Sequence, residues 1–213
     1  MTNPDQPRTG LCLASHSPRR RGLLEVLGVP FFVEAAGAEV EEAVDAAGRG
    51  QQAEEVALAR AAIKGRSVVD ALSGRGESCP VLSADTVVHI EDEILDKPGD
   101  ADEARRFLNR LSGTEHGVVT AVWLFDGKGE HTTWRRTMVN FAKLSPSTIE
   151  AYIETGEPFD KAGGYGIQGV GGTMVSRIDG CYFNVMGLPI HDLAKLLNRI
   201  GQPWTLNPQG RPF

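Results

Sequence analysis

The sequence is poor in cysteine, and its three cysteines, Cys12, Cys79 and Cys181, lie far apart. No C-x-x-C pair occurs, which argues against a zinc knuckle, and three scattered cysteines do not indicate a disulfide framework. We therefore expect three reduced thiols, as in cytoplasmic proteins. The polar N-terminus lacks the apolar segment of a signal peptide, and no apolar run approaches the roughly 18 residues of a membrane span. Both absences favour a cytoplasmic protein with no membrane segment.

Positive charge and aromatic residues are also scarce. Lysine and arginine total 22 against 28 aspartates and glutamates, so the net charge is −6, and 7% of the residues are aromatic. Broad nucleic-acid binding needs an excess of basic residues on one face and aromatic rings for stacking. We therefore expect no stable nucleic-acid binding. A nucleic-acid-binding module built on Arg19–Arg21 and Arg135–Arg136 stays open as an alternative. The P-loop pattern G-x-x-x-x-G-K-[ST] is absent, so a conventional NTPase is not indicated.

The composition is otherwise that of an ordinary globular protein. With 213 residues, 41% of them hydrophobic, the chain can form one sizeable domain or two small lobes. We expect one domain over residues 10–201, with terminal extensions at 1–9 and 202–213, and a loop in the acidic stretch 38–50. Predicted strands lie at residues 10–14, 29–36, 80–90, 117–126, 130–144 and 173–178, with a short strand after residue 92. Predicted helices lie at residues 18–27, 53–72, 101–112, 146–155 and 189–200. Because strands follow each other directly in two places, the pattern predicts an α/β fold with a mixed sheet flanked by helices.

The segment Ser17–Arg21 places three arginines where a helix begins. Ser17 suits the N-cap and Pro18 the first helical position. Cations are unfavourable at this positive end of the helix dipole, whereas phosphates bind there. Guanidinium groups of Arg19 and Arg20 would pair with phosphate oxygens. Alternatively, the arginines point into solvent or pair with the acidic loop 39–45, and Arg21 fits that alternative best.

Asp85 interrupts the apolar strand 80–90. A carboxylate on a central strand is costly unless it is paired, hydrogen-bonded or bound to a metal. Next to a threonine hydroxyl it can hold Mg²⁺ or position a water molecule. The competing interpretation is a solvent-facing aspartate on an edge strand.

Three lysines and a glycine-rich loop complete the candidate site. Lys64, Lys97 and Lys161 each follow an apolar or turn segment, and together with Arg19 they could neutralise a triphosphate, although each alone suits a surface lysine. Residues 163–169 contain a formal G-x-G-x-x-G, but no apolar strand precedes it and a strand follows, which argues against a dinucleotide site. Gln168 in this loop can read a base edge or hold a ribose or phosphate.

Six motifs in order give the chain a specific resemblance. These motifs are "LASHSPRRRGLL", "LARAAIKG", "SADTVV", "LDKP", "DKAGGYGIQGVGG" and "NVMGLP". They resemble the Maf family, and the resemblance runs from about Leu11 to Ile200. This family comprises cytoplasmic nucleoside triphosphate pyrophosphatases that are also linked to inhibition of septum formation. The resemblance implies a fold like that of inosine-triphosphate pyrophosphatases, with a cleft between two lobes, in a homodimer. "YGIQG" resembles the branch that acts on dTTP and UTP.

The resemblance also implies residue roles. It implies that Asp85 is the catalytic proton acceptor and lies next to the metal. It implies that Arg19, Thr86 and Gln168 determine the choice of substrate. The phosphate-cleft positions that it implies are Ser15, Arg20, Lys64, Lys97 and Lys161. Glu42, or its neighbour Glu41, matches an acidic residue that would hold a divalent cation, Mg²⁺ or Mn²⁺, together with Asp85. Gly65 departs from the family, which commonly has alanine there.

Together with the residues of the site, the resemblance implies hydrolysis of dTTP and UTP to the monophosphate and pyrophosphate. This reaction would remove selected or modified nucleotides from the pool, and the resemblance also implies a role in division arrest. The alternative is a nucleotide-binding regulator of septum formation that does no chemistry, which would keep the arginines but would not need Asp85.

Overall fold

The computed structural model describes residues 10–37, 39–40, 44 and 52–205. Its centre is one seven-stranded sheet in the order β2-β1-β3-β5-β6-β7, with β4 paired to β3. The strands are β1 (Leu11–Leu13), β2 (Phe31–Val33), β3 (Val81–Ile90), β4 (Glu93–Leu95), β5 (Glu115–Phe125), β6 (Glu130–Phe141) and β7 (Val175–Asp179). β1 runs parallel to β2 and β3, and the other pairs are antiparallel. The predicted mixed sheet is therefore confirmed.

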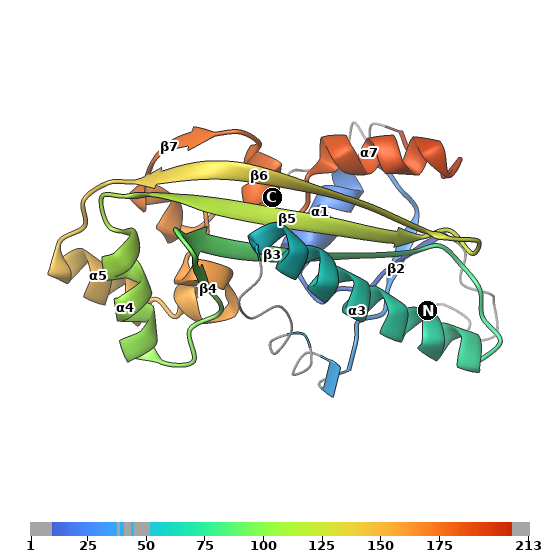
Figure 1. The fold of residues 1–213 in the computed structure, drawn as a ribbon, viewed down its shortest axis with the longest axis horizontal. Helices are drawn as coiled ribbons and strands as arrows, with labels where there is room; N and C mark the ends of the chain where they lie inside the picture. The colour runs from blue at the N-terminus through green and yellow to red at the C-terminus, as the bar shows by residue number, and fades with distance from the viewer. Residues whose placement is uncertain (1–9, 38, 41–43, 45–51, 206–213) are drawn as a thin grey trace.

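Helices cover both faces of this sheet (Figure 1). The α-helices are α1 (Pro18–Val26), α3 (Ala53–Gly74), α4 (Ala101–Leu111), α5 (Pro146–Glu154), α6 (Tyr182–Met186) and α7 (Ile190–Arg199). Short 3-10 turns are η1 (Glu157–Asp160), η2 (Ala162–Gly164) and η3 (Val170–Met174). Nowhere in the described part of the chain is a helix long and apolar enough to cross a membrane.

Alternating side chains of the long strands explain the two layers. Val81, Val87 and Trp123 pack against α3, whereas Leu82 and Leu124 pack against α1 and α7 on the other face. α4 and α5 pack at one end of the elongated sheet (Figure 1), on a cluster that contains Val88, Leu95, Phe107, Ile149 and Tyr165. The predicted N-cap at Ser17 is confirmed, and the predicted helices at 101–112 and 146–155 begin in the same way, because Ser17, Asp100 and Ser145 each accept a backbone N–H of the first turn.

One helix differs from the sequence-based expectations. Helix α6 was not predicted, because five residues are too few to show a helical period and no side chain caps its start. At the start of α4, the Glu103 carboxylate accepts the N–H of Gly99 and not that of Asp100, so the two residues do not form a capping box. Most of the predicted acidic loop 38–50 lies outside the described residues, so that prediction stays untested.

The chain after residue 201 also contacts the domain. The indole of Trp204 packs against the α1 and α7 core, and its N–H donates to Oδ1 of Asn198 at 2.8 Å. The N–H of Thr205 donates to the carbonyl of Leu27 at 3.1 Å. At least the start of the segment 202–213 is therefore attached to the domain.

The edge of β3 opposite β5 is interrupted in its middle. β1 pairs with β3 at Val81 and Leu82, and β4 pairs with it from Val88 to Ile90. Between them, no strand of the described chain pairs with residues 83–87 on this edge. Asp85 lies at the middle of the gap. On one side of the gap lies the apolar cluster of α1 and α7, and on the other side lies that of α4 and α5. We therefore look for the predicted cleft at this gap.

Candidate active site

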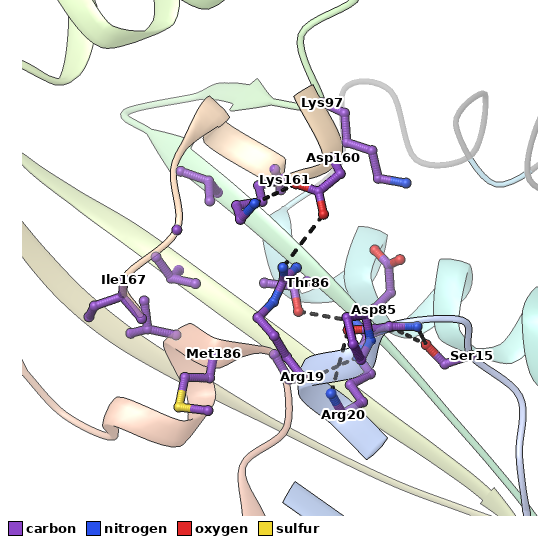
Figure 2. A pocket seen from close by; sticks show the side chains of 18 of the residues that line it. Ser15, Arg19, Arg20, Asp85, Thr86, Lys97, Asp160, Lys161, Ile167 and Met186 are labelled. Carbon is purple, nitrogen blue, oxygen red and sulfur yellow. Dashed lines mark hydrogen bonds and ion pairs between the residues drawn. The ribbon is translucent and has the colours of Figure 1, made fainter. Parts of the chain in front are cut away.

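A cavity of about 290 Å³ opens at this gap (Figure 2). Segments distant in sequence meet around it: the start of α1, the middle of β3, the loop from η1 to Ile167, and the end of α6. The lining residues are Ser15–Arg20, Lys64, Asp85, Thr86, Val88, Lys97, Val118, Asp160–Ala162, Tyr165–Ile167 and Val185–Gly187. Of the predicted site residues that the structure describes, it thus brings together all except Gln168.

The cavity lining combines charged and apolar side chains. The basic side chains are those of Arg19, Arg20, Lys64, Lys97 and Lys161. The apolar side chains are those of Val88, Val118, Tyr165, Ile167, Val185 and Met186. Such a lining suits a ligand that has an anionic end and a flat, weakly polar end.

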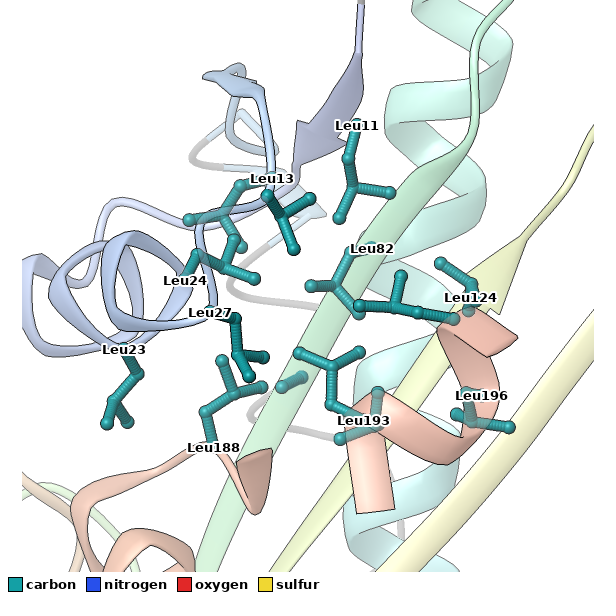
Figure 3. Close-up of a cluster of buried hydrophobic side chains, with 14 of the residues drawn as sticks. Leu11, Leu13, Leu23, Leu24, Leu27, Leu82, Leu124, Leu188, Leu193 and Leu196 are labelled. Carbon is teal, nitrogen blue, oxygen red and sulfur yellow. The ribbon is translucent and has the colours of Figure 1, made fainter. Parts of the chain in front are cut away.

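Leucines in the second half of α1 and directly after it pack the helix against the sheet (Figure 3). Leu23, Leu24 and Leu27 pack with Leu13 and Leu82 of the sheet in one buried cluster. The helix therefore presents its first turn to the cavity at a set angle. The hydroxyl oxygen of Ser15, just before the helix, accepts the N–H of Ser17 and Nη1 of Arg20, both at 3.2 Å. With its oxygen so used, the Ser15 hydroxyl can still donate its hydrogen to an anion.

The two arginines of the first turn have protein partners. Arg20 donates through Nε to the carbonyl of Gly187 at 2.8 Å and through Nη2 to Oγ1 of Thr86 at 3.2 Å. Nη1 of Arg19 lies 3.7 Å from Oδ2 of Asp160. Arg21 is exposed and outside the cavity lining. These contacts stabilise the two arginine side chains at this helix start within the protein itself, in addition to any stabilisation by a bound phosphate.

Asp85 and Thr86 point to opposite faces of the sheet, as neighbours on a strand do. Oδ1 of Asp85 accepts from Nζ of Lys64 on α3 at 2.8 Å, and both side chains are about one-tenth exposed. Thr86 lies on the face of α1 and α6, with Arg20. Both residues nevertheless line the same cavity. No strand pairs with this part of the β3 edge in the described chain, so the cavity can extend around the edge from one face of the sheet to the other. The interpretation of Asp85 as a solvent-facing aspartate is wrong for this structure, since the carboxylate is buried and paired.

Lys97 and Lys161 approach from the other side of the cavity (Figure 2). Lys161 donates to the carbonyl of Glu157 at 2.9 Å and pairs with Asp160. Burial alone would raise the pKa of Asp160, but the hydrogen bond from Lys161 and the charges of Lys161 and Arg19 lower it below its usual value. Asp160 is thus an anion placed among the cations of the cavity, a residue that the sequence analysis missed.

A buried arginine, Arg60, binds the side chain of Asp96, the residue directly before Lys97. Arg60, one turn before Lys64 on α3, is 5% exposed and donates to both carboxylate oxygens of Asp96, at 2.5 and 3.3 Å. The carbonyl of Asp96 accepts the N–H of Gly163, which ties the glycine-rich loop to the same point. The four-residue spacing of Arg60 and Lys64 was the sequence signal for this missed residue, because it places both on one helix face.

The glycine-rich loop is organised by one carboxylate. Glu157 accepts the N–H groups of Val170 and Gly171 and the hydroxyl of Tyr152. A Cβ at Gly169 would lie 2.3 Å from Oε2 of Glu157, so a larger residue would push this carboxylate away from the N–H groups that it accepts. The loop places Ile167 in the cavity lining, but the lining does not include Gln168. Glu42 and Glu41 lie outside the described residues.

The described residues contain no cluster of three side chains of the His, Cys, Asp and Glu type that would form a ready-made metal site. Mg²⁺, however, commonly uses one or two carboxylates together with phosphates of the substrate. Asp85 presents a hard oxygen ligand of this kind at the cavity, because only its Oδ1 is bonded to Lys64. This donor set fits a divalent cation that arrives with a phosphorylated ligand.

Comparison with known proteins gives a consistent result. The family described as "Maf-like protein" matches residues 10–200. A protein of Symbiobacterium thermophilum named dTTP/UTP pyrophosphatase is 45% identical over 194 residues, which cover 91% of this chain and 95% of that protein. Proteins of the same name from Anaeromyxobacter sp. and Chromobacterium violaceum are 43% and 45% identical, over 95% and 91% of this chain and 95% and 96% of theirs.

Proposed function

The chain belongs to the Maf-like protein family, and we propose that it is a nucleoside triphosphate pyrophosphatase that hydrolyses dTTP and UTP to the monophosphate and pyrophosphate. The observation that carries this proposal is the mixed lining of the cavity. Five basic side chains line it together with valine, isoleucine, tyrosine and methionine. The basic side chains would hold a triphosphate, and the apolar side chains would pack against a pyrimidine ring.

The charged and polar residues of the cavity would act as follows. Asp85 would orient the attacking water and accept its proton, held in place by Lys64. Arg19, Arg20, Lys64 and Lys97 would stabilise the charge that develops on the phosphates, and Ser15 and Lys161 would help to bind them. A divalent cation, Mg²⁺ or Mn²⁺, held by Asp85, by Glu42 and by phosphate oxygens, would neutralise part of this charge when bound.

Base choice would depend on Arg19, Thr86 and Gln168. A glutamine amide offers a donor and an acceptor, which matches the shared edge of uracil and thymine but not that of cytosine. Because Ile167 lines the cavity and Gln168 does not, Gln168 would have to turn inward when the nucleotide binds.

The test is a panel of nucleoside triphosphates incubated with Mg²⁺ or Mn²⁺, followed by separation of the products. Formation of monophosphate and pyrophosphate, fastest with dTTP and UTP and slower with dCTP and CTP, supports the proposal. Diphosphate and phosphate would contradict the reaction class, and equal rates on UTP and CTP would contradict the base argument. Nucleotide binding with no product would instead support the regulatory alternative.

We also propose that the enzyme works in the cytoplasm as a homodimer, with residues 10–201 as its domain and without nucleic acid as a partner. The family resemblance supports the dimer, and the acidic net charge of −6 supports the lack of nucleic-acid binding.

A further inference from the structure

A chain of hydrogen bonds leads from Arg20 in the cavity into the core of the sheet. Nη2 of Arg20 donates to Oγ1 of Thr86, and Oγ1 of Thr86 lies 3.0 Å from Oγ1 of Thr120 on β5 (Figure 2 shows Arg20 and Thr86). Oγ1 of Thr120 lies 2.8 Å from the backbone carbonyl of Asn184 in α6. Thr120 and Asn184 are fully buried, and neither lines the cavity.

The direction of these bonds follows from the groups at the inner end. The carbonyl of Asn184 can only accept, so the hydroxyl hydrogen of Thr120 must point to it; otherwise two acceptors would face each other in a dry site. Thr120 has one hydrogen, and its oxygen therefore accepts the hydroxyl hydrogen of Thr86. Thr86 is left with an oxygen that accepts from Arg20.

Asn184 is itself held firmly. Its Nδ2 donates to the carbonyl of Val118 at 2.9 Å and to Oγ1 of Thr137 at 3.0 Å, and its Oδ1 accepts the N–H of Thr120 at 3.1 Å. The same helix ends at Gly187, whose carbonyl accepts Nε of Arg20. A Cβ on Gly187 would lie 3.3 Å from Oγ1 of Thr86, so the end of the helix packs closely against Thr86 and Arg20.

We propose that Thr120 is a positioning residue of the active site, which fixes the hydroxyl of Thr86 and through it the guanidinium of Arg20. The proposal rests on the proposed function, because it assigns Arg20 to the binding of the triphosphate. Thr86 then influences substrate choice as a fixed acceptor for Arg20, and it has no hydrogen to donate to a base. A substrate group could approach Thr86 only as a donor.

The experiment uses Thr120→Val, which keeps the shape of the side chain and removes the hydroxyl. Turnover of dTTP by the wild type is measured first and decides the proposed function by itself. We expect KM for dTTP to rise roughly 3- to 10-fold in Thr120→Val, the range of one neutral hydrogen bond, with a smaller change in kcat. Thr120→Ser should restore KM to near the wild-type value, because it restores the hydroxyl.

Two comparisons separate positioning from general support of the fold. Thr137→Val is the matched control, since Thr137 also bonds to Asn184 and is buried but has no hydrogen bond toward Arg20. It should lower the unfolding temperature while leaving KM within about twofold of wild type. In an Arg20→Ala background, Thr120→Val should cause no further rise in KM, because linked residues are non-additive.

Unchanged KM in folded Thr120→Val would overturn the proposal. So would an equal rise in Thr137→Val, or an additive rise in the Arg20→Ala background. If Thr120→Val does not fold, Thr86→Val breaks the same chain at the cavity; it must raise KM and must be non-additive with Arg20→Ala, and an additive effect overturns the proposal.

Discussion

Gly65 on α3 lies against the indole of Trp123 on β5 with no room for a side chain between them. A Cβ built at Gly65 would lie 2.1 Å from Cε3 of Trp123 and 2.8 Å from Oγ of Ser83. The family resemblance implied alanine at this position, and glycine lowers the helix propensity there. The structure shows that glycine lets α3 approach the sheet closely beside a buried tryptophan, directly after Lys64 of the candidate site.

We predict that Gly65→Ala destabilises the protein although alanine is the better helix former. The added methyl must displace Trp123, and overpacking of this kind costs about 1–3 kcal/mol, against a gain of about 1 kcal/mol from propensity. Urea unfolding measures the change. Gly74→Ala, in the same helix, is the control, because its Cβ would meet nothing within 4 Å. Equal stability of the two variants would contradict this interpretation.

The stability of the protein should fall below about pH 6.5 because of His116. Burial, with a contribution from the charge of His89, lowers the pKa of His116 to about 4 from its usual value of 6.5. The unfolded chain therefore binds more protons between these values, so His116's contribution is complete above pH 6.5 and is lost as the pH falls toward 4. The expected loss between pH 7.5 and pH 5 is about 2 kcal/mol.

His116→Gln tests this assignment, since glutamine does not titrate and can keep the hydrogen bond that joins Nε2 of His116 to the Tyr165 hydroxyl. The variant should lose about 2 kcal/mol less unfolding free energy than the wild type between the two pH values. His191→Gln, at an exposed position, should behave as wild type. An identical loss in wild type and His116→Gln would show that another group is responsible.

Arg19→Ala should raise KM for dTTP about tenfold or more, because a charge-assisted contact with phosphate is lost. Arg21→Ala is a control of the same chemistry two residues away, exposed and outside the cavity. Its kinetics should match wild type. If both variants keep wild-type KM, the arginines of this helix start do not bind the triphosphate.

The sequence predicted most of the charged residues that line the cavity, but it did not predict the strand pairing that places them there. Local rules placed Ser17 at its cap and Asp85 on its strand, because capping and strand patterning depend on neighbouring residues. The interrupted edge of β3 depends on where β1 ends and β4 begins, and such register is a non-local property. Thr120 was hidden in an apolar strand pattern, and its role becomes visible only beside Asn184.

We propose that Asp85 of this cavity drives hydrolysis of dTTP, and the most direct test is kcat for pyrophosphate release by Asp85→Asn. Asparagine keeps the size of the side chain and an oxygen for Lys64, but it is no base and a weaker metal ligand. With folding confirmed by urea unfolding, we expect a loss in kcat of roughly 10² or more. A folded Asp85→Asn with kcat within about twofold of wild type would contradict it.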